Sequence, residues 1–481
     1  MDLATAKATL AKHHQEHILA FFNDLTPPQQ AALLEQVAEI DFDQLDRLIR
    51  TYLKMVPAMP RGKIEPPHIV PVRSADQAVL DTKARAFAQG EKLIGQGKVA
   101  AFVVAGGQGT RLGYEGPKGC LPSTPIQKKP LFQVFAEQVL AANQRYKTNV
   151  PLYVMTSPAN DVVTRSFFRQ HRYFGLDAKD VCFFVQGTMP AFDFEGKVLL
   201  ESKGGLALSP NGHGGSLLAL RKSGALADMA RRGVEYISYF QVDNPLVRAI
   251  DPLFIGLHAM EQADMSAKVL PKREPLEKLG NVCVVDGKTS VIEYSDMPED
   301  LARATTEDGR LKFSAGSIAI HILSRTFVEM LTGGGDVELP WHRAQKKVPF
   351  VDELGQQVKP TEPNAVKLEM FVFDALPLAK RVVVLETLRN EEFSPIKNAS
   401  GEDSLTSSLH DQIRRAATWL ELAGVSVPRD ADGQVAAAIE ISPLFANSAA
   451  ELAERVAELH LSIASGDNVY LGSRGQSGGL K

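Results

Sequence analysis

A glycine-rich segment with two nearby cations is the part of this sequence best suited to chemistry. Three of the four residues 106–109 are glycine, and they follow the apolar run 99–105, which predicts a loop at the end of a buried strand. Glycines let the backbone approach a ligand and point N–H groups at an anion. Arg111 and Lys118 add two positive charges to the same segment. The pattern predicts a loop that holds a phosphate chain, with a plain tight turn as the alternative.

The spacing of this loop excludes two common nucleotide-binding patterns. A P-loop needs Lys followed by Ser or Thr after its glycines, and that pair is missing here. The dinucleotide pattern Gly-x-Gly-x-x-Gly fails because Leu112 stands where the third glycine belongs. It also expects an acidic residue about 20 residues further on, where residues 127–129 are Gln, Lys and Lys. A dinucleotide-binding oxidoreductase is therefore disfavoured.

Length, composition and charge are those of an ordinary globular protein. The chain has 481 residues, a hydrophobic content of 44% and a charged content of 23%, so two or three domains are expected. The formal net charge of -4 gives no support to bulk electrostatic binding of nucleic acid or an anionic membrane. We therefore expect neither partner, and we expect anionic ligands to be met by local groups of Arg and Lys.

The cysteines and the first residues of the chain give an indication of the cellular compartment in which the protein acts. Cys120, Cys182 and Cys283 are scattered and lack the spacing of a zinc site or a disulfide framework. The first residues contain no apolar run like that of a signal peptide, and no segment approaches the roughly 18 apolar residues of a membrane span. These observations predict a cytoplasmic location.

The first 95 residues are expected to be mainly helical. Thr26 is a candidate N-cap followed by proline, and Asp41 is a candidate cap for another helix. Five prolines between residues 57 and 73 predict an extended connector. A further helix is predicted over 75–96. This region carries no recognisable chemistry.

Short apolar runs alternate with amphipathic segments between residues 99 and 250, which favours a parallel sheet flanked by helices. Ligands bind such sheets at the carboxyl ends of the strands. Gly106, Gln186 and Asp243 each stand at or just after such an end. The predicted strands are 99–105, 151–156, 181–185 and 234–242, and the predicted helices are 131–146, 159–171 and 216–232.

Beyond residue 265 the pattern changes to shorter strands, which predicts a mixed-sheet extension over the same cleft. An amphipathic helix, a short strand region, a last helix and a frayed, glycine-rich end are then expected. The predicted strands of the extension are Val282–Val285, Val291–Tyr294 and Arg381–Leu388. The later segments are Leu405–Leu422, 434–442, 448–459 and 472–481, in that order.

The segment AGGQGTRLGYEGPKG (105–119) resembles the signature loop of the UDP-sugar pyrophosphorylases of UDPGP type 1, and most of all the UDP-N-acetylhexosamine pyrophosphorylases. The resemblance continues in order through ten further segments, so it extends from about residue 95 to about residue 450. They are MTSPAND (155–161), FFRQHRYFGL (167–176), FFVQGTMPA (183–191), SPNGHGG (209–215), QVDNPLV (241–247), VIEYSDM (291–297), AQKKVPFVDELG (344–355), KLEMFVFD (367–374), EEFSPIKNA (391–399) and EISPLF (440–445).

The resemblance implies an α/β fold with a Rossmann-like nucleotidyltransferase core, a helical N-terminal region and a small C-terminal α+β domain. The expected boundaries are 1–95 for the helical region, 96–399 for the catalytic domain and 400–481 for the small domain.

The implied activity is uridylyl transfer. UTP and a sugar-1-phosphate, with N-acetylglucosamine-1-phosphate as the expected sugar substrate, would form a UDP-sugar and pyrophosphate. The attacking phosphate oxygen is already an anion, so such a site needs cations, a divalent metal and a carboxylate rather than a strong general base. The implied cofactor is Mg²⁺, and a monomer or weak homodimer is expected.

Individual roles are implied by resemblance alone. From the sequence itself, Asp243 is equally well explained as a strand-end cap, and an isolated Lys is usually a surface residue. The residues implied for catalysis are Arg111, Lys118 and Lys397. Those implied for UTP are Ala105, Gly106, Gly107, Gly109, Lys118, Gln186, Gly212, Asp243 and Lys367. Those implied for the sugar are His213, Glu293, Tyr294, Ser317 and Lys397, and Asp243 is the implied metal ligand.

The sugar pocket departs from the family pattern. His213 and Ser317 stand where the family usually has Asn, and Ser314 replaces a further Asn. Loss of an amide partner can shift sugar selectivity by a large factor. A broad enzyme for glucose- or galactose-1-phosphate is therefore one alternative. A non-catalytic UDP-sugar sensor is another, and retention of Arg111, Lys118, Asp243 and Lys397 argues against it.

Overall fold

The computed structural model describes residues 1–53, 62–335, 337, 339–457, 459 and 461–472. Backbone contacts divide the chain into two compact units. Unit 1 combines Met1–Met59, Gln186–Ser216 and Glu338–Asp374, and unit 2 combines Pro60–Val185, Leu217–Val337 and Ala375–Lys481. Each unit therefore contains segments that lie far apart in the sequence.

Unit 2 is built on a sheet that has ten strands within the described residues. The strands are β1 (Ile64–Glu65), β2 (Val99–Val104), β3 (Leu152–Thr156), β4 (Val181–Val185), β9 (Tyr236–Gln241), β10 (Met265–Pro271), β11 (Asn281–Val285), β12 (Lys288–Ile292), β13 (Ala315–Ser324) and β18 (Val382–Glu386). The order is β1-β11-β13-β9-β2-β3-β4, with β10 paired to β13 and β18, and β12 paired to β11.

The four strands predicted between 99 and 242 are confirmed, and they run parallel as β9-β2-β3-β4. Their apolar runs are buried: β2 is covered along nearly its whole length and β3 along all of it. Continuous apolar strands of this kind are typical of parallel sheets with both faces covered.

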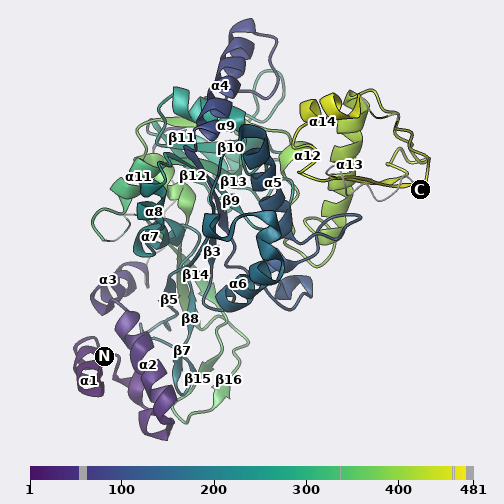
Figure 1. Ribbon diagram of the computed structural model, residues 1–481. Coiled ribbons are helices and arrows are strands. Elements are labelled where there is room, and N and C mark those ends of the chain that lie inside the picture. The colour runs from purple at the N-terminus through teal and green to yellow at the C-terminus, as the bar shows by residue number, and fades with distance from the viewer. Residues whose placement is uncertain (54–61, 336, 338, 458, 460, 473–481) are drawn as a thin grey trace. The chain divides into compact units, whose positions relative to one another are not determined.

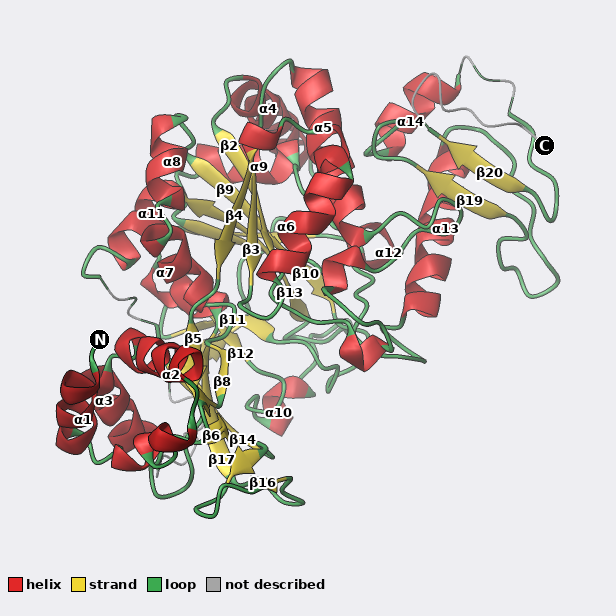
Figure 2. Ribbon diagram, turned by 60° about the horizontal axis from the view of Figure 1, so that its bottom comes forward, coloured by secondary structure: helices red, strands yellow, loops and turns green. Residues whose placement is uncertain are grey.

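Helices cover both sides of this parallel part. Figure 2 shows α5 and α6 on one side of the strands and α8 and α11 on the other. Helices α4 and α9 pack closely on each other (Figure 1). The bounds are α4 (Gln77–Gly95), α5 (Leu131–Tyr146), α6 (Asp161–Gln170), α8 (Ala225–Arg231), α9 (Pro252–Met260), α10 (Glu299–Ala302), α11 (Arg325–Leu331) and α12 (Arg389–Glu392).

Two expectations for unit 2 need correction. The single helix predicted over 216–232 is two helices, α7 (Gly215–Lys222) and α8, because the chain turns at Gly224, whose φ is +80°. The predicted strand Val291–Tyr294 ends at Ile292, before Tyr294. The predicted mixed extension past residue 265 is present: β13 pairs antiparallel with β9, and β10 to β13 and β18 continue the central sheet with antiparallel and parallel pairs.

The C-terminal part of unit 2 contains α13 (Leu405–Leu422), β19 (Ala438–Ile441), α14 (Ala449–Val456) and β20 (Asn468–Leu471). Helix α13 has the predicted bounds, and Ser404 caps it. The predicted strand near 434–442 is confirmed as β19, whereas its parallel partner β20 was not predicted. These elements enclose a small core of their own that includes Trp419 and Ile439.

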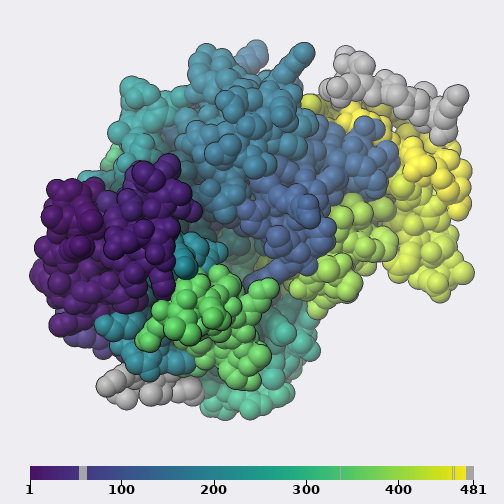
Figure 3. Space-filling model, turned by 90° about the horizontal axis from the view of Figure 1, so that it is seen from below, coloured from purple at the N-terminus to yellow at the C-terminus, as the bar shows by residue number. Residues whose placement is uncertain are grey.

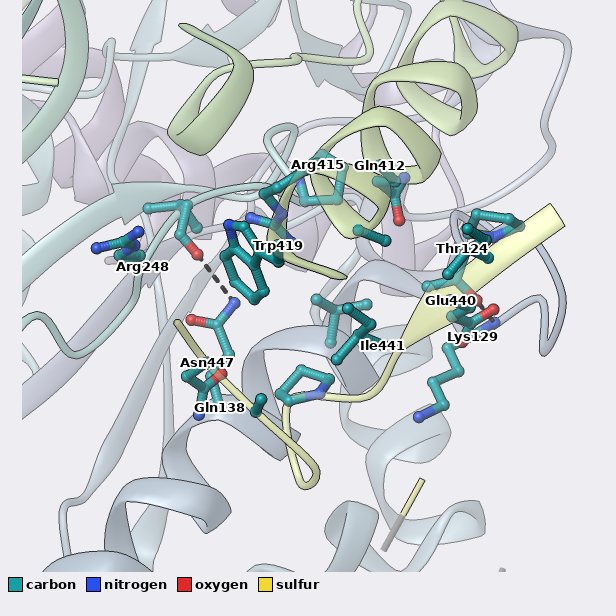
Figure 4. A pocket seen from close by; sticks show the side chains of 18 residues that line it. Thr124, Lys129, Gln138, Arg248, Gln412, Arg415, Trp419, Glu440, Ile441 and Asn447 are labelled. Atoms are coloured by element: carbon teal, nitrogen blue, oxygen red, sulfur yellow. Dashed lines mark hydrogen bonds between the residues drawn. The ribbon is translucent and has the colours of Figure 1, made fainter. Parts of the chain in front are cut away.

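The C-terminal part is joined to the rest of unit 2 by specific polar contacts. The Glu440 carboxylate accepts the backbone N–H groups of Ile126 (2.7 Å) and Gln127 (2.8 Å). Gln412 of α13 donates to the Ser123 carbonyl at 2.7 Å. A pocket lies along this junction, and Figure 4 shows Gln412, Arg415 and Trp419 of α13 facing it.

Unit 1 combines helices with short antiparallel strand pairs. Its elements are α1 (Leu3–Lys12), α2 (Pro27–Glu39), α3 (Phe42–Tyr52), β5 (Thr188–Pro190), β6 (Leu200–Ser202), β7 (Gly205–Leu206), β8 (Leu208–Pro210), β14 (Trp341–Lys346), β15 (Phe350–Val351), β16 (Gln357–Val358) and β17 (Ala365–Met370). Apolar side chains of the helices and of β5, β6 and β17 share one core. Figure 3 shows the purple N-terminal helices beside the green segment that contains β15 to β17.

The N-terminal helix predictions are confirmed in their main features. Thr26 forms a capping box with Gln29 at the start of α2, and the Asp41 side chain caps α3. The first helix ends at Lys12, and the apolar residues 18–22 lie around two 3₁₀ turns. The connector predicted over 57–73 lies outside the described residues up to position 61, as does the predicted frayed end from 473 onward.

No helix among the described residues is long and apolar enough to cross a lipid bilayer.

Two buried histidines should make the stability of unit 2 depend on pH. Burial lowers the pKa of His258 to about 3 and that of His321 to about 4. The unfolded chain binds these protons near pH 6.5, so each histidine should remove up to about 1.4 kcal/mol of unfolding free energy per pH unit as the pH falls below that value. Urea unfolding at pH 7, 6 and 5 should therefore show declining stability.

The matched variants are His258→Gln and His410→Gln, since His410 is exposed. The first should reduce the slope, with His321 still contributing, and the second should leave it unchanged. Equal slopes in both variants would contradict this assignment.

Candidate active site

The predicted site residues fall into two groups, one in each unit. In unit 2 the parallel pairing of β2 with β9 sets the arrangement, because Val104 pairs with Gln241. The Val242 N–H continues the ladder by donating to the Val104 carbonyl at 3.1 Å. The glycine loop after β2 and Asp243 after β9 therefore leave the sheet at the same edge.

The glycine loop is closed by its own backbone. Gly109 N–H donates to Gly116 O at 2.9 Å, and Lys118 N–H donates to Gly107 O at 3.1 Å. A Cβ at Gly109 would stand 2.8 Å from the Tyr114 ring and 2.9 Å from its carbonyl oxygen, so close packing demands glycine there. This folding explains part of the glycine content without a ligand.

The two cations of the loop lie on short 3₁₀ turns. Arg111 lies on the turn Thr110–Leu112 and is exposed, whereas Lys118 starts the turn Lys118–Cys120 and is half-buried. Ala105 is fully buried, and its backbone groups already bond to Met155 and Asn160. The roles of these residues toward UTP remain predictions.

Asn160 shapes the glycine loop, although it is not among the predicted site residues. Its amide donates to the carbonyls of Ala105 (3.0 Å) and Gly107 (3.4 Å), and its oxygen accepts the Ser157 N–H at 2.8 Å. The residue is 1% exposed. A polar side chain just past the carboxyl end of β3 was the available signal.

One pocket in unit 2 brings together three of the predicted residues. Asp243, Ser317 and Lys397 all line it, although they lie far apart in the sequence. A backbone hydrogen bond brings Asp243 and Lys397 to the same place, because the Ile396 N–H donates to the Asp243 carbonyl at 2.8 Å. Asp243 is half-buried and Lys397 is exposed.

Ser317 reaches this pocket from an irregular stretch of β13. The register between β10 and β13 shifts between Ala267 and Val269. Nearby Ala319, which also lines the pocket, has a φ of +55°, a left-handed conformation that is unfavourable for a residue with a side chain. Bulges of this kind occur beside functional sites, where they re-aim a side chain.

Glu293 lies close to Ser317, whereas Tyr294 does not pack into the sheet. A Cβ built on Gly280 would be 3.5 Å from Glu293 Oε1 and 3.9 Å from the Ser317 Cβ, so Gly280 lies between them. The Ser317 N–H donates to the Gly280 carbonyl at 2.8 Å. Tyr294 is 42% exposed.

In unit 1 the predicted residues gather around the segment 211–215. The Gln186 amide is buried and donates to the Gly212 carbonyl at 2.9 Å. Gly212 has a φ of +83°, and a Cβ there would be 2.3 Å from the Met370 carbonyl oxygen. Packing against the end of β17 therefore requires glycine at this position whatever the segment binds.

His213 and Lys367 belong to the same surroundings. The Val372 N–H donates to His213 Nδ1 at 3.1 Å, which places the proton of the neutral ring on Nε2. The ring stacks on Phe371 with centroids 5.2 Å apart. Lys367 is half-buried on β17, three residues before Met370. The His213 ring is therefore held in one orientation.

Metal binding by protein groups alone has no support in the described part of the chain, where no three His, Cys, Asp or Glu side chains gather at a common point. A single carboxylate such as Asp243 still fits Mg²⁺, which is usually held by one or two carboxylates together with substrate phosphates. The arrangement in unit 2 thus offers two cations on a glycine loop, and one carboxylate beside a lysine.

Comparison with known proteins places the chain in a family. Residues 42–422 match the family model described as UTP–glucose-1-phosphate uridylyltransferase. The chain is 39% identical over 469 residues to the UDP-N-acetylhexosamine pyrophosphorylase-like protein 1 of Homo sapiens, with 92% of each chain covered. It is 39% identical over 351 residues to the UDP-N-acetylglucosamine pyrophosphorylase of Saccharomyces cerevisiae, which covers 70% of this chain and 73% of that protein.

A solved structure gives the same result. The uridine diphosphate N-acetylglucosamine pyrophosphorylase of Trypanosoma brucei, determined in complex with an inhibitor, aligns with a TM-score of 0.83 and 26% identity over 98% of each chain. The mixed α/β architecture with its largely parallel central sheet is thus that of solved UDP-sugar pyrophosphorylases.

Removing the Asn160 amide should loosen the glycine loop without unfolding the sheet. Asn160→Ala deletes the donors to Ala105 and Gly107. Loss of about 1.4 kcal/mol of local stability corresponds to about tenfold faster amide exchange at Gly109 and Lys118. Hydrogen exchange measured by NMR would test this, with the amides of β4 as the internal control. Unchanged exchange at both loop amides would show that Asn160 does not hold the loop.

Proposed function

The chain belongs to the UTP–glucose-1-phosphate uridylyltransferase family, and from this membership we propose that it transfers the uridylyl group of UTP to a sugar-1-phosphate. The products are a UDP-sugar and pyrophosphate. The observation that carries the proposal is the convergence of Asp243, Ser317 and Lys397 on one pocket, at the sheet edge from which the glycine loop also leaves.

The reaction requires one bond to form and one to break. A phosphate oxygen of the sugar-1-phosphate attacks the α-phosphorus of UTP, and the bond from that phosphorus to the bridging oxygen of the β-phosphate breaks. The electron pair leaves with pyrophosphate. Since the attacking oxygen is an anion, the protein has to hold two anions together and stabilise the charge that develops on the leaving group.

The cations supply that stabilisation. Arg111 and Lys118 neutralise the β- and γ-phosphates as pyrophosphate leaves, and Lys367 contacts the phosphates of UTP. Lys397 contacts the phosphate of the sugar, which its place beside Asp243 and Ser317 supports. The backbone of Gly106, Gly107 and Gly109 approaches the phosphate chain closely.

Gln186 and Gly212 recognise the uracil ring in this proposal. A Gln amide offers a donor and an acceptor, which suits the imide edge of uracil. The hydrogen bond from Gln186 to the Gly212 carbonyl fixes both groups relative to each other, which supports a shared ligand.

Asp243 would hold Mg²⁺ together with phosphate oxygens of the substrates. The ion would neutralise charge on the phosphates and orient them. The Ile396 N–H on the Asp243 carbonyl fixes the backbone from which the carboxylate projects.

The proposed sugar substrate is N-acetylglucosamine-1-phosphate. His213, Glu293 and Ser317 are the groups proposed to meet the sugar, together with Tyr294. The 39% identity to two proteins named for N-acetylated hexosamines favours this substrate. Glucose- or galactose-1-phosphate is the second candidate, because a hydroxyl and an imidazole stand where amides are usual.

The proposal also covers the domain boundaries, the cellular location and the oligomeric state. We propose that residues 96–399 form the Rossmann-like catalytic domain, with 1–95 and 400–481 as the helical and small domains. We further propose that the protein acts in the cytoplasm as a monomer or weak homodimer.

Arg111→Ala should lower turnover by a factor of about 100 or more, because one cation that stabilises the leaving pyrophosphate is lost. The assay is pyrophosphate release from UTP and Mg²⁺ with N-acetylglucosamine-1-phosphate. Arg303→Ala is the matched control, since Arg303 is an exposed arginine paired with Glu299 on α10. Wild-type turnover in Arg111→Ala would refute the assigned role.

Ser317→Ala should lower kcat/KM for N-acetylglucosamine-1-phosphate by about tenfold, because a hydrogen-bond partner of the sugar is removed. Ser290→Ala is the control, since Ser290 lies on β12 of the same sheet, its hydroxyl donates to the Lys288 carbonyl, and it does not line the pocket. A panel of N-acetylglucosamine, N-acetylgalactosamine, glucose and galactose 1-phosphates completes the test.

The wild-type protein should prefer the N-acetylated sugars in this panel. Preference for glucose or galactose would establish the second candidate. UDP-sugar binding without pyrophosphate release from any sugar would contradict catalysis and indicate a sensor.

A further inference from the structure

A fully buried lysine lies behind the pocket that contains Asp243 and Lys397. Lys268 on β10 is 1% exposed, and its Nζ contacts the carboxylates of Asp251 (2.5 Å) and Glu392 (2.6 and 2.8 Å). Both carboxylates are buried as well, Glu392 to 3% exposure. Burial raises the pKa of Asp251, but Lys268 and Arg248 outweigh it and hold that pKa below its ordinary value.

Glu392 is the member of this cluster with the most partners. Besides Lys268, its carboxylate accepts the Thr387 hydroxyl at 2.6 Å and the Arg248 backbone N–H at 3.4 Å. Thr387 follows β18, and Arg248 belongs to the segment after β9. A single side chain thus joins β10, the end of β18 and the segment that begins at Asp243.

The backbone around Glu392 extends this link to the pocket. The Asn244 amide donates to the Glu392 carbonyl at 2.6 Å, and Asn244 Oδ1 accepts the Ser394 N–H at 3.1 Å. Two residues further on, the Ile396 N–H donates to the Asp243 carbonyl. Lys397 follows directly. The short segment 392–397 is therefore held against 243–244 at three successive points.

Helix α13 holds the other side of the same segment. The Ser394 hydroxyl donates to Asp411 at 2.6 Å, and the Ser408 hydroxyl donates to the Ser394 carbonyl at 3.0 Å. The Lys397 N–H then donates to the Asp403 carbonyl at 2.6 Å, which closes the exposed loop before α13. The loop 397–403 is therefore closed by this bond. The segment that leads into the loop is held by the buried cluster around Glu392.

Burial makes the contacts between Lys268 and Glu392 costly to break. A buried ammonium group is costly unless charged partners surround it, and removing one partner leaves an uncompensated charge. Both oxygens of Glu392 accept from Lys268, so no rotation of the side chain preserves these bonds if one oxygen is replaced by an amide group. The position of Glu392 therefore determines where the segment to Lys397 begins.

We propose that Glu392 is a positioning residue for uridylyl transfer, acting through Lys397, which it places at the pocket that Asp243 also lines. The inference rests on the proposed function and deepens it. Lys268 itself is too buried to meet a substrate, and Asp251 lies on the far side of the cluster, where it caps α9 by accepting the Leu253 N–H at 3.0 Å.

The test compares two isosteric substitutions that remove one carboxylate each from the same lysine. Glu392→Gln breaks the anchor, whereas Asp251→Asn keeps an effective N-cap and does not touch the segment 392–397. Both variants should lose thermal stability. Glu392→Gln should lower kcat about tenfold at saturating substrates, with KM for UTP little changed, while Asp251→Asn should keep kcat within about twofold. Equal losses of kcat, or none in Glu392→Gln, would overturn the proposal.

A double-mutant cycle separates positioning from a general structural role. If Glu392 acts through Lys397, the double variant Glu392→Gln/Lys397→Ala should turn over within about twofold of Lys397→Ala alone. Multiplying losses would show that Glu392 acts by another route and would overturn the proposal.

Thr387→Val keeps the test decisive if Glu392→Gln does not fold. This variant removes only the hydroxyl donor to Glu392 Oε2, so kcat should fall about threefold with the fold intact. An unchanged kcat would overturn the proposal. Failure of the wild-type protein to form any UDP-sugar would refute the proposed function and this inference together, whereas wild-type turnover with an unaffected Glu392→Gln refutes the inference alone.

Discussion

The parallel pairing of β2 with β9 is the constraint on which the site in unit 2 depends. It sends the glycine loop and Asp243 out of the same edge of the sheet, although some 130 residues separate them in the sequence. The pairing is stable because both strands are apolar runs covered on both faces. The contact of Ile396 with Asp243 is made just past the end of β9.

The negative charge of a phosphate substrate has to be met by local cations in this protein. The formal net charge is -4, so a polyanionic substrate is not attracted by the chain as a whole. Arg111 and Lys118 concentrate positive charge on one loop, and Asn160 holds that loop by its carbonyls without adding charge. The buried Lys268 is paired with the buried carboxylates of Asp251 and Glu392, and its role is structural.

Much of the fold could be predicted from the sequence because its periodic patterns are long and undisturbed. The strands at 99–104 and 181–185 follow from apolar runs, and the helix Leu405–Leu422 follows from an amphipathic pattern. The two helices predicted as one were missed because a single glycine, Gly224, lies within an otherwise helical pattern. Strand β20 was missed because it lies directly before the glycine- and serine-rich segment 472–481, which was expected to be frayed.

The site was only partly predictable from the sequence, because distant segments of the chain form part of it. Gly106, Gln186 and Asp243 could be found from their places after predicted strands, and the roles of Lys367 and Lys397 came from resemblance alone. The meeting of Ser317 and Lys397 depends on a bulge in β13 and on bonds between distant segments, which no local pattern shows. Lys268 and Glu392 look like ordinary surface charges in the sequence, since their burial follows from tertiary packing.

The central claim is uridylyl transfer, and the fate of the phosphates of UTP tests it most directly. Wild-type protein would be incubated with Mg²⁺, N-acetylglucosamine-1-phosphate and UTP carrying radioactive phosphorus at either the α- or the γ-position. The account predicts that the α-label appears in a UDP-sugar and the γ-label in pyrophosphate, in equal amounts. Release of the γ-label as inorganic phosphate, or an α-label that remains in UTP while UDP-sugar still binds, would contradict it.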